Sequence, residues 1–450
     1  MAAHALDSAF LKDLYGSAAM RAIFEDDALL QKWLDVEAAL ARAEAARGII
    51  PHDAAAEITR QATAVGFDID AIKRGIDRTA HPLVSVIWQL SERCTGDAGN
   101  YVHWGATTQD VMDSALVLQF ADAFPLLENT LDSLIDAACT LARAHHDTLM
   151  AGRTHGQHAL PLTFGYKVAV WVAELRRHGE RLRTCKPRLL TGQFAGAVGT
   201  LASIGADGFA LQAAFMAELG LNTPEIAWHT ARDSFAEFAN ILAMLAATCG
   251  KIAHEIIDLQ KSEVGEVEEP FEIGKVGSST MPQKRNPMLC EAILTLARLS
   301  RYNAAAALDA MLHEHERDWS SVQMDWKTLP ELCIMAHGAL ALAERVLRGL
   351  HVYPDAMRRN IEAGGGLLLA ERVMLALGKN IGRQHAHDLI HAAAMRAIDQ
   401  KLSFAAVLKA EPQIAAHLSD ETIDALLDPA QYTGLASQMA LRIVNSEEGK

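Results

Sequence analysis

The segment 274–287 contains the kinds of side chain that proton-transfer chemistry needs. It reads Gly-Lys-Val-Gly-Ser-Ser-Thr-Met-Pro-Gln-Lys-Arg-Asn-Pro, and its glycines permit positive φ and loop motion. Ser278 offers a hydroxyl, Lys284 a cation and Asn286 an amide donor. Such groups suit removal of a proton beside a carboxylate, because the cation and the donor stabilise that carboxylate as it gains a second negative charge. The same composition also fits a solvated connector between two helices.

A second polar segment, residues 107–110, reads Thr-Thr-Gln-Asp and follows a His-Trp-Gly sequence at 103–105. Thr107 and Asp110 have the spacing of a capping box, in which side chains satisfy backbone N–H groups of the first helical turn. A helix N-terminus is also a natural site for an anion. The segment therefore predicts a helix start, and a structural cap and an anion site are compatible interpretations of it.

A third segment, residues 152–158, reads Gly-Arg-Thr-His-Gly-Gln-His. The imidazole of His155 can give or take a proton near neutral pH. A histidine at such a place can equally be structural or simply exposed, and this alternative stays open from the residues alone. We interpret His158 as a neighbour of the site.

Long helices are the elements that must position these segments. From Ser234 to Ser262 there is no proline, and apolar residues recur every three or four positions, at Phe235, Phe238, Leu242, Leu245 and Cys249. Similar runs cover about 110–148, 159–187, 287–311 and 328–350. Five long helices imply an elongated bundle, which often buries a further face by oligomerising. Strand signals are weak throughout.

Shorter helices are expected on both sides of this bundle. Turn residues interrupt the stretch up to about 105, and glycines at 364–366 interrupt the stretch after about Tyr353. The sequence therefore predicts an all-α fold with three domains: an N-terminal helical domain at 1–110, a central long-helix bundle at 111–355 and a C-terminal helical domain at 356–450.

Composition limits the partners. The net charge of −15 disfavours nucleic acid or an anionic membrane, although a local group of Arg and Lys can still hold a small anionic substrate. No apolar stretch is long enough for a membrane span, and the N-terminus shows no secretory signal, so we expect a cytoplasmic protein. The six scattered cysteines are expected to be reduced.

No metal or cofactor is expected. The 19 histidines include a pair at 387 and 391 and a pair at 313 and 315, but neither pair has a third ligand at a suitable spacing. A solvated helix face is the preferred interpretation of both pairs. The sequence also has no glycine-rich nucleotide motif and no Gly-x-Ser-x-Gly motif.

The string at 277–287, Gly-Ser-Ser-Thr-Met-Pro-Gln-Lys-Arg-Asn-Pro, resembles the signature loop of the fumarase/aspartase superfamily, Gly-Ser-Ser-x-Met-Pro-x-Lys-x-Asn. This resemblance implies that Ser278 is the catalytic base. It also implies that Lys284 and Asn286 bind a substrate carboxylate and that the loop closes over the substrate.

Two further segments resemble conserved regions of the same superfamily. Residues 107–110 are similar to its first region, which implies that the hydroxyls of Thr107 and Thr108 hold a substrate carboxylate. Residues 152–158 are similar to its Thr-His-x-Gln region. The resemblance implies that His155 assists the leaving group or orients the substrate, and that Gln157 binds substrate.

Other candidate contacts follow from the resemblance. The glycine turn at 196–200 is similar to one that lines the same cleft in the superfamily. Arg232 and Arg317 are candidate contacts to substrate anions, although Arg317 stands in an alternating charged run that also fits a solvated face.

The resemblance also implies a quaternary structure. In the superfamily the central bundle assembles into a 20-helix core in a homotetramer, and each active site draws on three subunits. The expected partners are therefore copies of this chain and a small anionic polycarboxylate.

Within the superfamily the run of residues looks closest to 3-carboxy-cis,cis-muconate cycloisomerase, with adenylosuccinate lyase next. The cycloisomerase likeness includes the segments 228–233, 313–317 and 427–432. One residue departs from it, because the bacterial cycloisomerases carry a tryptophan where this chain has His155. The fumarate-releasing members of the superfamily keep a histidine at this position. The nucleotide-phosphate features of adenylosuccinate lyase are incomplete here.

The sequence thus leaves several hypotheses. The first is a lyase that performs reversible β-elimination on a succinyl-type polycarboxylate, such as an N-substituted aspartate, and releases fumarate through a carboxylate-stabilised carbanion. The alternatives are the muconate cycloisomerase reaction, adenylosuccinate lyase activity, and a non-catalytic structural protein on the same fold, as in lens crystallins. The presence of Ser278, Lys284 and His155 favours an enzyme.

Overall fold

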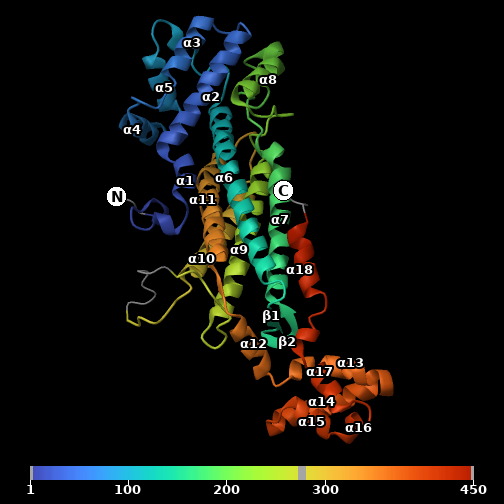
Figure 1. Cartoon of the computed structure of the whole chain (residues 1–450). Coiled ribbons are helices and arrows are strands. Elements are labelled where there is room, and N and C mark those ends of the chain that lie inside the picture. Colours follow the sequence, from blue (N-terminus) through green and yellow to red (C-terminus); the bar gives the residue numbers. More distant parts are fainter. Residues whose placement is uncertain (1–3, 272–279, 447–450) are drawn as a thin grey trace. The chain divides into compact units, whose positions relative to one another are not determined.

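The computed structural model describes residues 4–271 and 280–446 of the chain (Figure 1). Helices make up 69% of it and strands 4%, so the predicted all-α class is confirmed. The chain forms two compact units. Unit 1 consists of Met1–Leu131, His178–Gly250 and Thr295–Ala341, and unit 2 consists of Asp132–Arg177, Lys251–Leu294 and Leu342–Lys450. The three domains expected from the sequence stay a prediction.

Five long helices are present where the apolar periodicity predicts them. They are α6 (Thr108–Ala144), α7 (Phe164–Leu189), α9 (Asp233–Gln260), α10 (Met288–Asp309) and α11 (Trp319–Gly349). Each of them contributes residues to both units. Two predicted starts are wrong: α7 begins at 164 and not at 159, because a strand occupies 157–163, and α11 begins at 319 and not at 328.

The other helices of unit 1 are short, apart from α2, which has 21 residues. They are η1 (Ala5–Asp7), η2 (Lys12–Leu14), α1 (Ala18–Ile23), α2 (Asp26–Ala46), α3 (His52–Gln61), α4 (Ile69–Thr79), α5 (Val84–Arg93), η3 (Ala98–Tyr101), η4 (Gly205–Asp207) and α8 (Gly208–Leu219). Helix α2 packs against α3 and α8. Its buried face consists mainly of alanine and leucine, which allows close helix–helix approach.

Aromatic side chains hold α6 against α9 in unit 1. The ring of Phe238 on α9 lies 5.3 Å from that of Phe120 and 5.9 Å from that of Phe124, both on α6. All three are fully or almost fully buried. Helix α9 is also long and apolar enough to cross a membrane, but 72% of its most apolar window is buried inside the protein, as in the core helix of a folded domain.

Unit 2 contains two small antiparallel sheets. Strand β1 (Leu149–Thr154) pairs with β2 (Gln157–Thr163), and β3 (Val267–Glu268) pairs with β4 (His351–Val352). The first hairpin was not predicted, because its strands are short and lack a clear apolar–polar alternation. Leu149 and Ala151 of β1 pack on Ile361 of a neighbouring helix.

The remaining elements of unit 2 are short helices, most of them gathered in one group (Figure 1). They are α12 (Pro354–Ala363), η5 (Leu367–Leu369), α13 (Ala370–Ile381), α14 (Arg383–Gln400), α15 (Phe404–Ala410), α16 (Pro412–Ala415), α17 (Asp420–Leu426), η6 (Pro429–Gln431) and α18 (Ala436–Asn445). Phe404, Leu377 and Leu408 belong to their shared apolar core.

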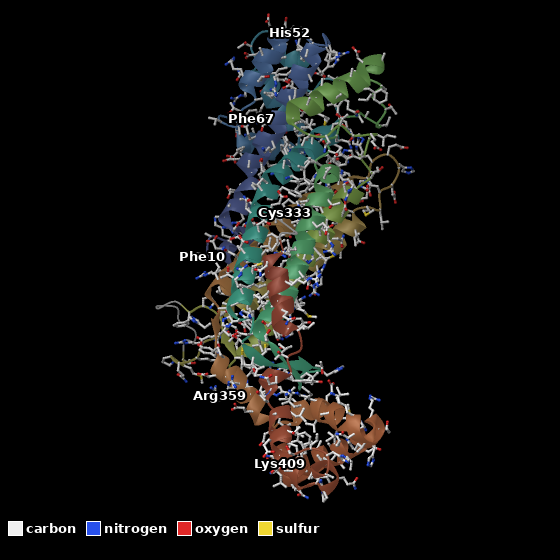
Figure 2. All side chains as sticks on the ribbon, turned by 45° about the vertical axis from the view of Figure 1, so that its right-hand side comes forward. Phe10, His52, Phe67, Cys333, Arg359 and Lys409 are labelled. Atoms are coloured by element: carbon white, nitrogen blue, oxygen red, sulfur yellow. The ribbon has the colours of Figure 1, made fainter. Side chains whose placement is uncertain are left out.

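All six cysteines lie in the described ranges, and none forms a disulfide. Five of them are buried. Cys333 on α11 is fully buried, whereas Phe10 near the N-terminus is 93% exposed (Figure 2). Burial raises the pKa of the Cys333 thiol, so it behaves as an apolar core residue rather than a nucleophile.

Helix α2 buries two carboxyl groups, Glu37 and Glu44, which are each 1% exposed. Neither carboxylate oxygen of Glu44 has a hydrogen-bond partner among the described residues. Burial, with a smaller contribution from the charge of Glu37, raises the pKa of Glu44 from 4.5 to about 9. Glu44 is therefore a neutral acid at pH 7.

This buried acid predicts a pH dependence of stability. The unfolded chain loses the Glu44 proton near pH 4.5 and the folded chain only near pH 9. The contribution of protonated Glu44 to the free energy of unfolding is therefore complete below pH 4.5 and is lost as the pH rises towards 9. Because Glu44→Gln stays neutral, we expect its free energy of unfolding relative to wild type to rise by a few kcal/mol, to order of magnitude, over that window. Urea unfolding at a series of pH values measures the difference, and a constant difference would contradict it.

Candidate functional site

The N-terminus of α6 carries the first group of predicted site residues. Thr107 directly precedes the helix, and its backbone N–H donates to Oδ2 of Asp110 at 3.0 Å. This bond is one half of the predicted capping box. The backbone N–H of Asp110 in turn donates to the Thr107 carbonyl at 2.9 Å. The first turn of α6 therefore has a fixed geometry around the two threonines.

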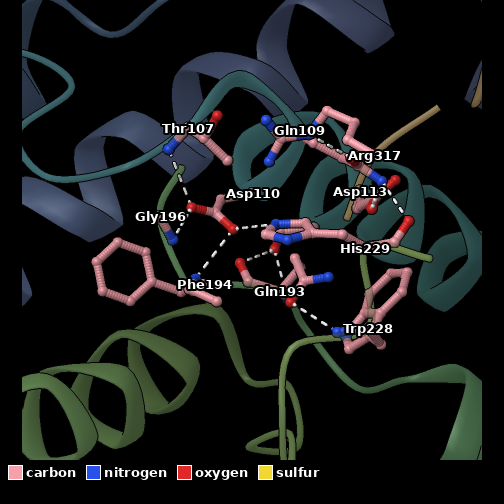
Figure 3. Close-up of polar contacts among 12 residues, drawn as sticks. Thr107, Gln109, Asp110, Asp113, Gln193, Phe194, Gly196, Trp228, His229 and Arg317 are labelled. Carbon is pink, nitrogen blue, oxygen red and sulfur yellow. Dashed lines mark hydrogen bonds and ion pairs between the residues drawn. The ribbon is translucent and has the colours of Figure 1, made fainter. Parts of the chain in front are cut away.

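Asp110 is 1% exposed and lies at the centre of a larger hydrogen-bond network (Figure 3). Its Oδ1 accepts hydrogen bonds from the Ala195 backbone N–H at 3.0 Å and from Nε2 of His229 at 2.8 Å. Its Oδ2 accepts a further bond from the Gly196 backbone N–H at 2.9 Å. Because a carboxylate only accepts, Nε2 of His229 carries the proton. Asp110 thus joins the α6 N-terminus to the glycine turn at 196.

Gln109 extends this network on the neighbouring face of α6 (Figure 3). Its amide Nε2 donates to the His229 carbonyl at 2.8 Å and to Oδ2 of Asp113 at 3.1 Å. Its Oε1 accepts a bond from Nε of Arg317 at 2.9 Å. The candidate anion contact Arg317 is therefore held by a buried amide, and its NH2 group has no partner among the described residues. A solvated face, the other interpretation of Arg317, does not fit this placement.

Arg232 is 2% exposed and lies between two carboxylates. Its NH1 and NH2 donate to Asp113 at 2.7 and 3.0 Å, and its Nε donates to Asp325 at 2.9 Å. Burial lowers the pKa of Arg232, but the charges of Asp113 and Asp325 outweigh it and raise the pKa. Burial also raises the pKa of Asp325, to about 6. Because Nε, NH1 and NH2 of the guanidinium all donate to these two carboxylates, the geometry favours a positioning role for Arg232 over the predicted direct contact with substrate.

A histidine stands beside the second threonine of the turn. The hydroxyl of Thr108 is 3.1 Å from Nε2 of His81, whose ring stacks on Trp319 with centroids 6.1 Å apart. Burial, together with the nearby His103, lowers the pKa of His81. His81 is therefore neutral at pH 7 and can exchange a hydrogen bond with the threonine hydroxyl.

The loop before α6 is fixed by a buried ion pair. His103, at a φ of 61°, places Nδ1 2.6 Å from Oε1 of Glu37 on α2. Burial lowers the pKa of His103, but Glu37 and Asp110 outweigh it and raise the pKa. A carboxylate partner thus stabilises a left-handed conformation that a non-glycine residue rarely adopts.

His155 lies in unit 2, at the tip of the hairpin formed by β1 and β2. His155 and Gly156 form its turn with φ values of 54° and 75°, and Thr154 pairs with Gln157 across it. Two positive φ values are typical of a type I′ turn, which matches the twist of the flanking strands. Both His155 and Gln157 are exposed, so their side chains are available to a ligand.

The signature loop is described from Thr280 onward, and the predicted base Ser278 lies outside the described residues. Lys284 is exposed, and its backbone N–H closes a turn onto the Met281 carbonyl at 3.1 Å. Asn286 is half-buried and stands two residues before the start of α10. These residues belong to unit 2, as do His155 and Gln157.

The predicted site residues thus fall into two groups. Unit 1 brings Thr107, Thr108 and Arg232 into one connected network. The network runs through Gln109 and Asp110, which the sequence did not single out as site residues. Such a network of helix N-terminus, histidine and arginine suits recognition of an anion. Among residues 4–271 and 280–446, no group of three or more side chains could hold a metal ion.

Two family models match this chain. The model described as "Lyase" matches residues 16–299, and the one described as "Adenylosuccinate lyase C-terminus" matches residues 366–443. The first covers more than half of the chain. This chain belongs to the fumarase/aspartase superfamily. It is accordingly an enzyme of the lyase or cycloisomerase type, as the signature loop predicted.

Several relatives match over nearly the full length. The N-acetyl-S-(2-succino)cysteine lyase of Dickeya dadantii is 41% identical over 449 residues, which cover 100% of this chain and 99% of that one. The 3-carboxy-cis,cis-muconate cycloisomerase of Pseudomonas aeruginosa is 44% identical, over 95% of this chain and 94% of that one. The crystal structure of the 3-carboxy-cis,cis-muconate lactonizing enzyme from Pseudomonas putida matches with a TM-score of 0.91 at 40% identity, over 97% and 98% of the two chains.

In this superfamily member the buried carboxylate of Asp110 predicts a clear mutational effect. Asp110→Asn puts an NH2 group against backbone N–H donors, whichever way the amide turns. Because each buried donor left unsatisfied is unfavourable by about 1–3 kcal/mol, we expect the free energy of unfolding to fall by roughly 2–5 kcal/mol. Urea or thermal unfolding measures the loss.

Asp122→Asn is the matched control on the same helix. Asp122 pairs with Lys32 at 2.7 Å but is 50% exposed, so its loss should change stability by less than about 1 kcal/mol. An equal effect of the two substitutions would contradict the role assigned to Asp110.

Proposed function

We propose that this enzyme performs reversible β-elimination on a 2-substituted succinate and releases fumarate. The observation that carries the proposal is the signature loop, together with 41% identity over the full chain to a relative named N-acetyl-S-(2-succino)cysteine lyase. Elimination from a succinate requires a base for the proton next to one carboxylate and groups that hold the carboxylates. The predicted residues supply both kinds of group.

The proposed roles follow the chemistry of each side chain. Ser278 removes the proton, and Lys284 and Asn286 stabilise the carboxylate that becomes doubly charged. The hydroxyls of Thr107 and Thr108, at the positive end of the α6 dipole, hold a second carboxylate. This placement is supported by the fixed α6 N-terminus, because a rigid donor set loses less free energy on binding. Gln157 binds substrate beside the hairpin turn.

His155 assists the departing group in this proposal. Its place at an exposed hairpin tip, held by the β1–β2 pairing, suits a residue that reaches into a site completed by another subunit. A homotetramer with active sites shared among three subunits is therefore part of the proposal, as is a cytoplasmic location. Within such a tetramer the groups of unit 1 and unit 2 can come from different chains.

The leaving group is an amine or a thiol. An amine leaves only after it gains a proton, because its anion is a very strong base. A thiol has a pKa of about 8.5 and can leave as the thiolate. Loss of His155 should therefore slow elimination of an amine more than elimination of a thiol.

A second candidate is the cycloisomerase reaction. It is supported by 44% identity to the Pseudomonas aeruginosa 3-carboxy-cis,cis-muconate cycloisomerase. Both reactions run through the same carboxylate-stabilised carbanion, so the same base and carboxylate contacts serve either. The histidine at 155, where the bacterial cycloisomerases carry tryptophan, favours the fumarate-releasing reaction.

A substrate panel separates these functions. We expect fumarate from at least one 2-substituted succinate when the pure protein is incubated with N-substituted aspartates, adenylosuccinate, N-acetyl-S-(2-succino)cysteine and 3-carboxymuconate. Ultraviolet absorbance follows fumarate and muconate. Turnover of 3-carboxymuconate without any fumarate would assign the cycloisomerase instead, and no turnover of any member of the panel would contradict the proposed substrate class.

The base and the acid can be tested on the substrate so found. Ser278→Ala should lower kcat by at least about 100-fold without loss of folding, because loss of a general base commonly lowers the rate 10²–10⁴-fold. His155→Gln should lower kcat about tenfold or more for an amine leaving group and less for a thiol. A folded Ser278→Ala enzyme with near wild-type kcat would show that the proposed mechanism is wrong.

A further inference from the structure

Three glutamates in the segment 266–269 of unit 2, at 266, 268 and 269, each bind a different partner. The segment includes β3 and stands just before the signature loop. Glu266 and Glu269 are 0% and 3% exposed, and the side chain of Glu268 is 16% exposed. Carboxylates withdrawn from water this far need specific donors. Their hydrogen-bond donors lie close in sequence to the predicted substrate contacts of unit 2.

Glu266 binds the hairpin that carries His155. Its carboxylate accepts two bonds from Arg153 on β1, at 2.6 and 3.0 Å, and one from Nδ2 of Asn360 at 2.7 Å. The pair is bidentate, so it fixes direction as well as distance. Arg153 is separated from the turn residue His155 by a single residue, and the hairpin end is thereby anchored to the residue that directly precedes β3.

Glu268 binds the signature loop itself. One carboxylate oxygen accepts a bond from NH1 of Arg285 at 2.6 Å, and the other accepts a bond from the hydroxyl of Tyr353 at 2.8 Å. Pairing of β3 with β4 brings Tyr353 to this place, because it directly follows β4. Burial raises the pKa of Glu268, but the bonds from Arg285 and Tyr353 outweigh it and lower the pKa. The carboxylate is thus charged at neutral pH.

Arg285 stands between the two predicted carboxylate contacts, Lys284 and Asn286. Besides its ion pair, its guanidinium lies 4.7 Å from the ring centroid of Phe271, and its backbone carbonyl accepts a bond from Nε2 of Gln260 at 3.2 Å. Both the side chain and the backbone of this residue are therefore held. Since adjacent residues share a peptide plane, the positions of Lys284 and Asn286 are limited as well.

Glu269 binds the start of α10, which follows the stretch 284–286. Its carboxylate accepts bonds from the backbone N–H groups of Leu289 and Cys290 in the first turn of α10, at 3.0 to 3.2 Å. Its own N–H donates to Oε1 of Gln260 at 2.9 Å. The helix N-terminus that follows Asn286 is thereby bound to the segment that also holds Arg285.

We propose that the segment 266–269 is a positioning frame for the reaction, in which Glu268 acts through Arg285 to place Lys284 and Asn286, and Glu266 acts through Arg153 to place the His155 turn. The proposal rests on the proposed function, because those residues contact substrate only there. None of the frame residues contacts the reacting atoms. They are positioning residues, and the frame links the His155 turn to the stretch that carries Lys284 and Asn286.

A purely structural ion pair would behave differently. The Arg285 side chain is 53% exposed, and exposed ion pairs contribute little to stability. A misplacement of about 1 Å at a reacting group, however, lowers the rate by up to about 100-fold. Loss of the pair should therefore change turnover far more than stability.

The test uses Glu268→Gln, Arg285→Met and Tyr353→Phe in the full chain. We expect kcat on the substrate identified by the panel to fall at least about tenfold in the first two variants, with a smaller fall for Tyr353→Phe and little change in Tm. The main effect should be on kcat rather than KM, because Lys284 and Asn286 stabilise the charge that develops in the transition state. Arg285→Lys keeps the charge without the planar fork and should restore part of the loss.

Glu411→Gln is the matched control. It breaks the pair of Glu411 with Arg396, which has the same 2.6 Å distance and similar exposed fractions, 46% for arginine and 18% for glutamate, against 53% and 16% for Arg285 and Glu268. Within the described ranges, neither residue has a hydrogen bond or ion pair to a predicted site residue. We expect wild-type kcat and KM from this variant.

Hydrogen exchange of the peptide 280–288 provides a readout that does not depend on catalysis. Faster exchange of this peptide in Glu268→Gln, and not in Glu411→Gln, supports the frame. If the wild-type enzyme turned over no substrate of the panel, the proposed function would fail while this measurement still tested the frame. The frame itself is overturned if Glu268→Gln and Arg285→Met match Glu411→Gln in both turnover and exchange.

Discussion

The buried carboxylate of Asp110 has to be surrounded by hydrogen-bond donors, because a charge cannot be withdrawn from water without them. Three backbone N–H groups and His229 meet this demand. The N-terminus of α6, the glycine turn at 196 and the His229 loop must therefore converge on one point. The arrangement of the threonine hydroxyls, and of the Gln109 amide that holds Arg317, depends on that convergence.

The same physical solution recurs in unit 2. Segments that carry chemistry are irregular, and their backbone groups lack the partners that a helix or sheet provides. Glu269 supplies acceptors for the first N–H groups of α10, and Glu266 and Glu268 bind arginines that flank predicted site residues. In unit 1 a buried carboxylate on the long helix α6 binds the glycine turn, and in unit 2 the carboxylates of the segment 266–269 bind the hairpin, the signature loop and the start of α10.

The two units carry different kinds of functional group. Unit 1 presents a helix N-terminus, a neutral His81 and a held Arg317, which suit recognition of a carboxylate. Unit 2 presents the hairpin histidine and the cation and amide of the signature loop, which suit stabilisation of a carbanion and assistance to a leaving group. In the reaction that we propose, His155 assists the leaving group, and fumarate is the product.

The sequence by itself determined the superfamily, the long helices and the α6 start, because a short motif, a helical apolar period and the spacing of Thr107 and Asp110 are local properties of the chain. The hairpin at His155 could not be predicted, since its strands are short and its pairing is decided by packing on the rest of unit 2. The surroundings of Arg232 were also hidden. Its second carboxylate, Asp325, is 93 residues away in sequence. Only the tertiary structure decides such pairings, because side chains far apart in sequence carry no signal of which partner they will meet.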